Sequence, residues 1–141
     1  MPSPGDLVKR VAFHTVADPE QWTVSNEPAC LVVTEKNWST YYSSPPGSSD
    51  FANYIYLVAS LGLKPNPGYT VRVLRVERLK DSVTIIVELK EPDPRKAYPQ
   101  ILVRPVAVAK VAKADLEPRG TLDFAFIDQK GRQLFRQETE I

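Results

Sequence analysis

The chain has 141 residues, of which 43% are hydrophobic and 25% are charged, values typical of one globular domain with its own core. Its 18 basic and 17 acidic side chains give a formal net charge of +1. This near-neutral total gives no reason to expect nucleic acid or an anionic membrane as a partner. The 13 prolines disfavour long helices and favour short strands joined by stiff turns. We therefore predict a single, mainly β domain over residues 1–141.

Cysteine and histidine occur once each, which limits the chemistry that the chain can perform. Cys30 alone excludes an internal disulfide framework, and together with His14 it cannot supply the four ligands of a structural zinc site. A Cys–His nucleophile pair would need both side chains in one cleft with a third, orienting group. Cys30 instead lies in an apolar run, where cysteine is usually a small buried hydrophobe. We predict no catalytic residues, no metal and no cofactor.

The sequence contains no candidate transmembrane segment. No apolar run approaches the ~18 residues of a membrane span, and residues 1–6 lack the basic and apolar regions of a signal peptide. Two alternatives stay open: a cytoplasmic protein, or an exported protein presented without its leader.

The first quarter of the chain predicts short extended segments separated by turns. Residues 7–16 have the imperfect apolar alternation of a strand with a bend near Lys9, and Trp22 begins a second extended piece. The apolar run 29–33, bounded by turn residues, is typical of a buried strand.

One short helix is predicted, from about residue 35 to residue 42. The Thr34 hydroxyl can accept a hydrogen bond from a first-turn amide and so cap the helix. Three aromatic residues have the i, i+3, i+4 spacing of one helix face: Trp38, Tyr41 and Tyr42. The Ser/Pro-rich run 43–49 cannot continue the helix.

The clearest strand patterns occupy the middle of the chain. Residues 54–61 are apolar and aromatic, as expected for a strand buried on both faces. Residues 69–78 and 82–90 alternate between apolar and polar positions and predict an antiparallel hairpin. The alternation of the first of these slips by one residue, which predicts a β-bulge near Val73–Leu74.

A turn separates these patterns. Asn66, Pro67, Gly68 and Tyr69 fit a type II turn, in which Pro67 presets φ and Gly68 accepts a positive φ. A β-turn needs these residue types for its geometry alone. Tyr69 would then begin the next strand as a core aromatic.

The last third of the chain predicts an interrupted strand and a hairpin. Residues 101–112 form a long strand pattern in which Pro105 requires an edge or a bulge, because proline cannot donate to the ladder. Residues 121–137 predict a hairpin around a type I turn at 128–131, with Gly131 in the left-handed region. We expect the tail from Gln137 to Ile141 to be frayed.

These elements together define a fold class. They predict a mainly β structure: an antiparallel β-sandwich or a partly closed barrel of about seven to nine strands, with one short α-helix.

Several motifs between residues 29 and 113 resemble a known family. They are Trp38 in the helix, Asp50–Phe51 before a strand, the Leu-Gly-x-x-Pro-x-x-Gly-Tyr pattern of residues 61–69, Pro92 and Pro94 in a loop, and Pro105 before Val106. In this order they resemble the PrcB-like family, whose C-terminal domain is found in protease-complex subunits of bacterial envelopes. The hairpin 121–137 lies outside the resemblance.

The resemblance implies a function. It implies a non-enzymatic domain that binds and stabilises a protein partner, such as a secreted protease, at an extracytoplasmic or cell-envelope location. Asn66, Pro67, Gly68 and Tyr69 are the candidate partner-binding residues.

Two other functions stay open. The candidate turn also resembles the Asn-Pro-x-x-Gly-Tyr loop of chagasin-type cysteine-protease inhibitors, with two residues fewer. A β-sandwich can alternatively bind a small ligand or glycan, here in a groove beside the 62–68 loop.

The charged clusters favour solvated surfaces. Three carboxylates lie close together in the sequence: Glu88, Glu91 and Asp93. Acid–base catalysis by them is not indicated, because the sequence places no partner base and no Gly-rich loop beside them. A basic stripe consists of Arg72, Arg75, Arg78 and Lys80. Acidic residues interrupt it, so we predict the charged outer face of a sheet instead of a nucleic-acid surface.

Overall fold

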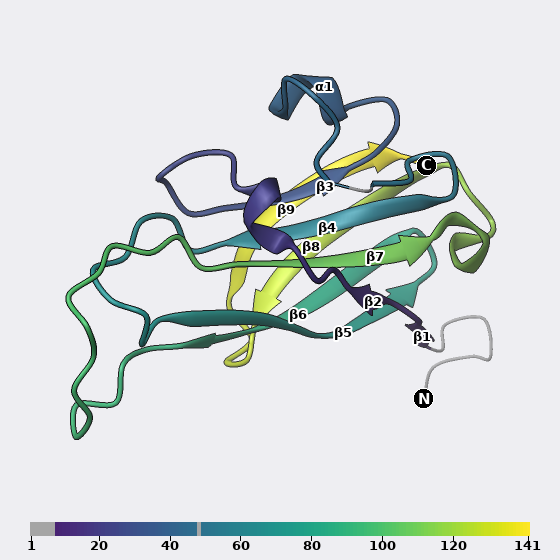
Figure 1. Cartoon of the computed structure of the whole chain (residues 1–141). Coiled ribbons are helices and arrows are strands. Elements are labelled where there is room, and N and C mark those ends of the chain that lie inside the picture. Colours follow the sequence, from purple (N-terminus) through teal and green to yellow (C-terminus); the bar gives the residue numbers. More distant parts are fainter. Residues whose placement is uncertain (1–7, 48) are drawn as a thin grey trace.

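Two β-sheets packed face to face form the protein (Figure 1). The computed structural model describes residues 8–47 and 49–141. In these residues the strands are β1 (Lys9–Val11), β2 (His14–Thr15), β3 (Ala29–Val33), β4 (Tyr54–Ser60), β5 (Thr70–Leu79), β6 (Ser82–Lys90), β7 (Val106–Ala112), β8 (Thr121–Asp128) and β9 (Gln133–Glu140). One sheet has the order β1-β5-β6-β8-β9 and the other the order β2-β7-β4-β3. The predicted β-sandwich is confirmed, and the described strands form no closed barrel.

The predicted hairpin is the largest strand pair. β5 and β6 are antiparallel, and the register shift between Val73 and Arg75 confirms the predicted bulge. β8, on the other side of β6, runs parallel to it. This pair departs from the predicted all-antiparallel sandwich because the chain crosses to the other sheet as β7 and reverses before it returns.

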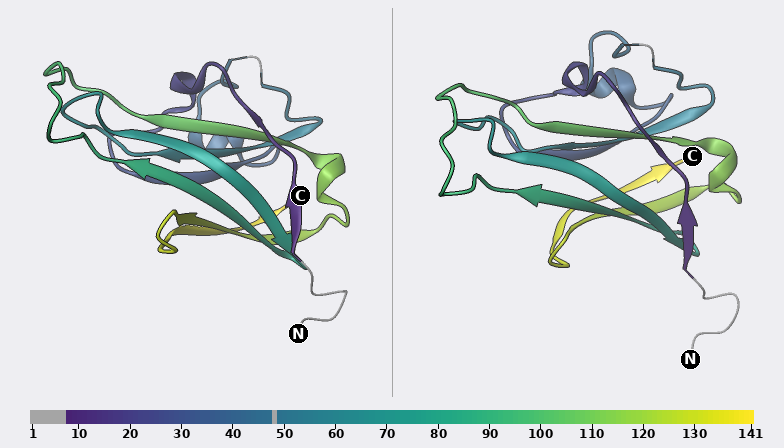
Figure 2. Two further views of the ribbon diagram at one scale, coloured as in Figure 1. Left: turned by 90° about the horizontal axis from the view of Figure 1, so that it is seen from below. Right: turned by 60° about the horizontal axis from the view of Figure 1, so that its bottom comes forward.

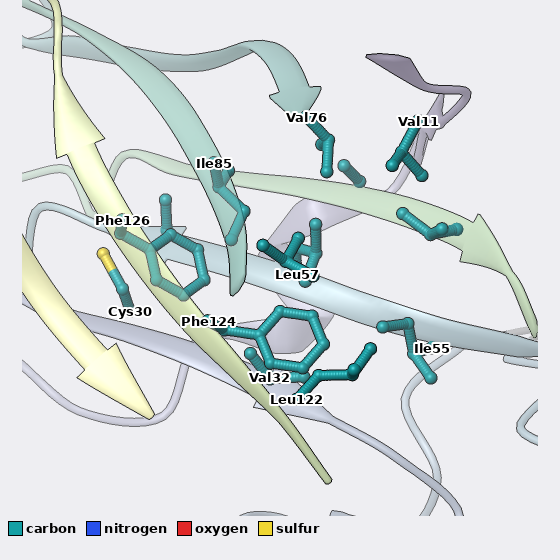
Figure 3. Close-up of a cluster of buried hydrophobic side chains, with 14 of the residues drawn as sticks. Val11, Cys30, Val32, Ile55, Leu57, Val76, Ile85, Leu122, Phe124 and Phe126 are labelled. Carbon is teal, nitrogen blue, oxygen red and sulfur yellow. The ribbon is translucent and has the colours of Figure 1, made fainter. Parts of the chain in front are cut away.

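The main core lies between the sheets (Figure 3). Every second residue of β6 and β8 points inward, as the sequence alternation requires. Their fully buried side chains are Val83, Ile85, Val87, Leu122, Phe124 and Phe126. Each contributes about 1.5–3 kcal/mol of hydrophobic stabilisation relative to an exposed position.

A second, aromatic layer covers the outer face of the four-stranded sheet. It contains the 3₁₀ helix Pro19–Trp22 and side chains of the short helix α1 (Trp38–Tyr41). Trp22 stacks on Tyr56 with 4.4 Å between ring centroids, and the Tyr42 hydroxyl donates to the Trp22 carbonyl oxygen at 2.7 Å. β4 is therefore buried on both faces, as its continuous apolar run predicts.

The N-terminal segment differs from the predicted single strand. It divides into β1, which pairs with β5, and β2, which pairs with β7 in the other sheet. The predicted bend near Lys9 is in fact a crossing between sheets after Val11. Leu7, part of the predicted strand, lies outside the described residues. Trp22 ends a 3₁₀ helix instead of beginning an extended piece, because it is buried in the aromatic layer.

Helix α1 begins three residues later than predicted. Residues 35–37 form a turn in which the Asn37 side chain accepts from the Thr34 N–H at 2.7 Å and donates to the Val32 carbonyl oxygen at 2.9 Å. The Thr34 hydroxyl accepts from the Lys36 N–H at 3.3 Å. These side-chain bonds hold the turn, so only one helical turn follows, with its aromatic side chains packed as predicted.

β7 is shorter than the predicted strand 101–112. It begins at Val106, directly after Pro105, because residues before the proline leave the sheet. Val103 instead pairs with Lys64 in an isolated antiparallel bridge.

The C-terminal hairpin forms as predicted, but its tail is not frayed. Gly131 has φ +85° and donates to the Asp128 carbonyl oxygen at 3.0 Å, which confirms the turn. β9 continues to Glu140, and the Ile141 N–H donates to the Gly120 carbonyl oxygen at 2.8 Å. Polar residues continue this strand because its backbone pairs with β8 and its Thr139 side chain is buried.

The side of the sandwich where edge strands β3 and β9 face each other, the β3/β9 edge, is closed by a side chain. The Gln137 amide accepts from the Val32 N–H at 3.1 Å and donates to the Val32 carbonyl oxygen at 3.0 Å. One side chain thus satisfies two backbone groups of an edge strand that a neighbouring strand would otherwise occupy.

Candidate functional site

Two long connections project together at one end of the sandwich (Figure 2). One joins β4 to β5 (residues 61–69) and the other joins β6 to β7 (residues 91–105). The N–H groups of Lys64 and Val103 donate to each other's carbonyl oxygens at 2.8 and 2.9 Å, and the Leu61 N–H donates to the Pro105 carbonyl oxygen at 3.0 Å. The pair is therefore braced by backbone hydrogen bonds, although neither connection belongs to a sheet.

Gly62 holds the first connection against the segment before β3. It has φ +77°, and an added Cβ would lie 2.5 Å from the Asn26 carbonyl oxygen, so only glycine fits. The same carbonyl oxygen accepts from the Leu63 N–H at 2.8 Å, and the Asn26 side chain accepts from Arg104 Nε at 2.6 Å. Asn26 thus links both connections.

The predicted type II turn at residues 66–69 is wrong in its geometry. Gly68 does not have a positive φ; its N–H donates to Asn66 Oδ1 at 2.9 Å, which closes the turn through a side chain. Glycine is required for space, since an added Cβ would lie 2.8 Å from Pro92 Cβ. Tyr69 is half-buried beneath the Lys64 ammonium group, 5.0 Å from its ring centroid, and lies outside both core clusters.

Of the four candidate residues, Pro67 alone is exposed. Asn66, Gly68 and Tyr69 make the internal contacts just described, so their residue types are explained by the turn. Their role in partner binding stays a prediction.

Sequence reasoning missed a group of exposed aliphatic side chains on the same connections. Leu63, Ile101 and Leu102 are 37%, 57% and 68% exposed; we call them the loop-end surface. The sequence pattern assigned Ile101 to a strand. Pro99 and Pro105 could have indicated a loop at this position, because two prolines this close interrupt the hydrogen bonds of a regular strand ladder. Aliphatic groups exposed on a braced loop are typical of protein contacts.

The carboxylates near this end are not arranged for acid–base catalysis. The Arg72 guanidinium hydrogen-bonds Glu88 at 2.8 Å and lowers the pKa of that carboxyl. Hydrogen bonds from the Arg95 side chain and backbone likewise lower the pKa of Asp93. Both groups are held as anions in surface ion pairs.

The basic stripe is neutralised, and one member is not on the surface. Arg75 pairs with Glu77. Arg78 is buried, and its guanidinium donates to the carbonyl oxygens of Leu116 and Pro118, both at 2.8 Å. The prediction of an outer charged face is wrong for Arg78, because its guanidinium has backbone acceptors in the crossover between β7 and β8.

Cys30 and His14 do not come together. They lie on β3 and β2, the two outermost strands of the four-stranded sheet, three strand spacings or roughly 14 Å apart. Burial raises the pKa of the Cys30 thiol to about 12. Within the described residues no cluster of three or more potential metal ligands occurs.

A cleft beside the aromatic layer lies away from the loop-end surface. It has a volume of about 280 Å³ and is lined in part by Trp22, Tyr56 and Lys110. None of the helices in the described part of the chain is long and apolar enough for a membrane crossing.

Comparison with known protein families identifies a match in the middle of the chain. The family described as PrcB C-terminal matches residues 55–112. This span contains β4 except Tyr54, both long connections, the β5–β6 hairpin and β7. No curated protein and no solved structure matches the chain.

Proposed function

Residues 55–112 belong to the PrcB C-terminal family, and from this premise we propose that the chain is a non-catalytic module that binds and stabilises a partner protein. We propose a protease or an envelope complex as that partner, and an extracytoplasmic location. The family resemblance supports both parts of the proposal.

The observation that carries the binding role is the loop-end surface. Its aliphatic groups lie on connections whose backbones are fixed by the Lys64–Val103 bridge and by the contact of Gly62 with Asn26. A fixed loop loses little conformational entropy when a partner covers it, so its apolar area contributes more fully to binding. Both connections belong to the family-matched span.

Affinity capture from native envelope fractions tests the proposal. The tagged chain should recover a protease or a multi-subunit envelope complex, and the double substitution Ile101→Asp with Leu102→Asp should abolish recovery. Leu79→Asp is the matched control, because Leu79 is as exposed as Leu63 but ends β5 at the far end of the molecule. Recovery of no protease and no envelope complex would overturn the proposal. Equal recovery with both variants would show that the partner contacts a surface other than the loop-end surface.

The location is tested separately by fractionation of the native organism. Detection of the chain in the envelope or medium is expected. Detection in the cytoplasm alone would contradict that part of the proposal.

A further inference from the structure

β5 is only partly covered on the side facing away from β6. β1 pairs there with Val76, Glu77 and Arg78 alone, because the N-terminal segment then crosses to the other sheet and pairs with β7. Among the described residues, no strand pairs with residues 70–75 on that side, and no loop backbone hydrogen-bonds to them. This half of β5 therefore presents free edge backbone.

β5 and β7 approach each other on one side of the sandwich, which we call the β5/β7 edge (Figure 2). An apolar slot lies there, beside the free edge of β5. The slot has a volume of about 130 Å³, and its lining includes Val71 and Val73 of β5 and Val106 and Val108 of β7. Val71 and Val73 are only half-buried, whereas Val76, beyond the bulge on the same strand, is 1% exposed. The core of the sandwich is thus incompletely covered at this position.

We propose that the β5/β7 edge binds an extended peptide segment of a partner protein by β-strand addition. The partner backbone pairs with residues 70–75, and alternate aliphatic side chains of the partner enter the slot. Edge N–H and C=O groups bind any extended backbone, and the apolar slot selects the side chains. Arg72 adds no free charge at the slot, because its guanidinium is already bonded to Glu88.

A second copy of the chain fits this edge poorly through its own β5. In each copy Val71 and Val73 already point toward that copy's slot and core. The alternate residues Thr70 and Arg72 are exposed and polar, and Leu74, the next in this alternation, is the half-buried residue of the bulge, so a paired β5 has no alternating aliphatic side chains to place in the slot. The occupant we infer is therefore a different, alternately aliphatic segment. This site is separate from the loop-end surface, and the inference does not depend on the partner bound there.

Selection from a phage-displayed library of random twelve-residue peptides tests the proposal. The expected result is enrichment of peptides with aliphatic residues at alternate positions. In nuclear magnetic resonance titration, a synthesised selected peptide should shift the amides of residues 70–75 and 106–108. Val71→Lys and Val106→Lys place a charge in the slot and should each weaken binding about tenfold or more. Circular dichroism and thermal unfolding confirm that each variant is folded.

Two matched controls keep the outcomes distinct. Leu79→Lys introduces the same charge at the other end of β5, and Leu102→Lys introduces it on the loop-end surface; both should leave peptide affinity unchanged. The proposal is overturned if no peptide is enriched, if the folded slot variants bind as well as the parent chain, or if the shifted amides lie elsewhere. A β5-mediated homodimer detected by sedimentation would also overturn it.

Discussion

The β3/β9 edge and the β5/β7 edge of the sandwich differ in how the backbone N–H and C=O groups of their edge strands are covered. At the β3/β9 edge the Gln137 amide occupies both hydrogen-bonding groups of Val32. At the β5/β7 edge β1 covers only the end of β5 near Arg78, and residues 70–75 have no covering strand in the described part of the chain. An edge strand is available to another chain only where its backbone groups are free.

The comparison shows that closing an edge does not require a strand. A single amide carries one donor pair and one acceptor, which matches the C=O and N–H of one edge residue. A short strand (β1) and a side chain (Gln137) thus both cover edge backbone that another chain could otherwise pair with. Neither of them covers residues 70–75 of β5. Substitutions near both edges break or sharpen this contrast.

Arg78→Met should have the largest effect. The Arg78 guanidinium donates to three carbonyl oxygens, those of Lys80, Leu116 and Pro118, and so ties the covered end of β5 to the β7–β8 crossover. Methionine preserves bulk but leaves acceptors unpaired, at a cost of about 3–5 kcal/mol in the free energy of unfolding. Urea denaturation measures this loss.

Arg75→Met is the control for Arg78. It removes a more exposed ion pair with Glu77 and should cost about 1 kcal/mol or less. Equal losses for the two variants would show that the buried contacts of Arg78 do not stabilise this end of the edge.

Gln137→Ala should open the β3/β9 edge. The substitution leaves the Val32 N–H without its Gln137 acceptor and the Val32 C=O with the Asn37 side chain as its remaining side-chain donor, which costs about 1–3 kcal/mol. Hydrogen exchange at the Val32 amide should accelerate together with the loss in urea stability. Glu138→Ala, the exposed neighbour on β9, should change neither quantity; unchanged exchange in Gln137→Ala would show that the edge is closed by other contacts.

Asp128→Asn tests the hairpin turn that positions β9, and its effect depends on pH. The Arg132 and Lys130 N–H groups each donate to Asp128 Oδ1 at 2.9 Å, and Arg132 Nε donates to Oδ2 at 2.9 Å. The backbone bond from Arg132 is the main cause of the lowered pKa of Asp128.

The sign of the pH effect follows from that lowered pKa. The stabilisation is fully present above the ordinary aspartate pKa of about 3.9 and disappears as pH falls through the lower folded-state pKa. Asp128→Asn should be less stable than the parent at neutral pH, and the difference should shrink below about pH 4. Thermal unfolding from neutral to strongly acidic pH measures it, and a difference independent of pH would contradict the assignment.

The sequence was most informative where local pattern and tertiary environment agree. The alternation of β6 and the one-residue slip in β5 predicted the hairpin and its bulge, because side-chain period fixes which face is buried. The continuous apolar run of β4 predicted burial on both faces. The aromatic spacing of Trp38, Tyr41 and Tyr42 predicted the packed face of α1.

The errors have tertiary causes. The bond from Gln137 to Val32 spans 105 positions, so a polar tail that looked frayed became an ordered strand. Gly68 matched a type II turn, but the Asn66 side chain and the nearby Pro92 set a different geometry. The loop-end surface was missed because Ile101 continues the apolar pattern of the following strand. The bridge of Val103 to Lys64, a contact distant in sequence, is what places this segment in the connection before β7.

The smallest effect is expected in the chemical labelling of Cys30, which reports on opening of the β3/β9 edge. Cys30 lies on β3, two residues from Val32, with its side chain in the core between the sheets (Figure 3). Burial raises its pKa to about 12, so at mildly alkaline pH the folded protein contains far less thiolate than an exposed cysteine would. Iodoacetamide should therefore label the parent chain slowly.

Gln137→Ala should accelerate that labelling, while Glu138→Ala, its exposed neighbour on β9, should not. Labelling requires an opening that exposes the thiol, and the rate follows the free energy of that opening. An acceleration in Gln137→Ala equal to that predicted from its global loss of stability would mean that Cys30 is exposed only by complete unfolding. The β3/β9 edge would then be part of the cooperative core, and the contrast with the open half of β5 would be sharper still.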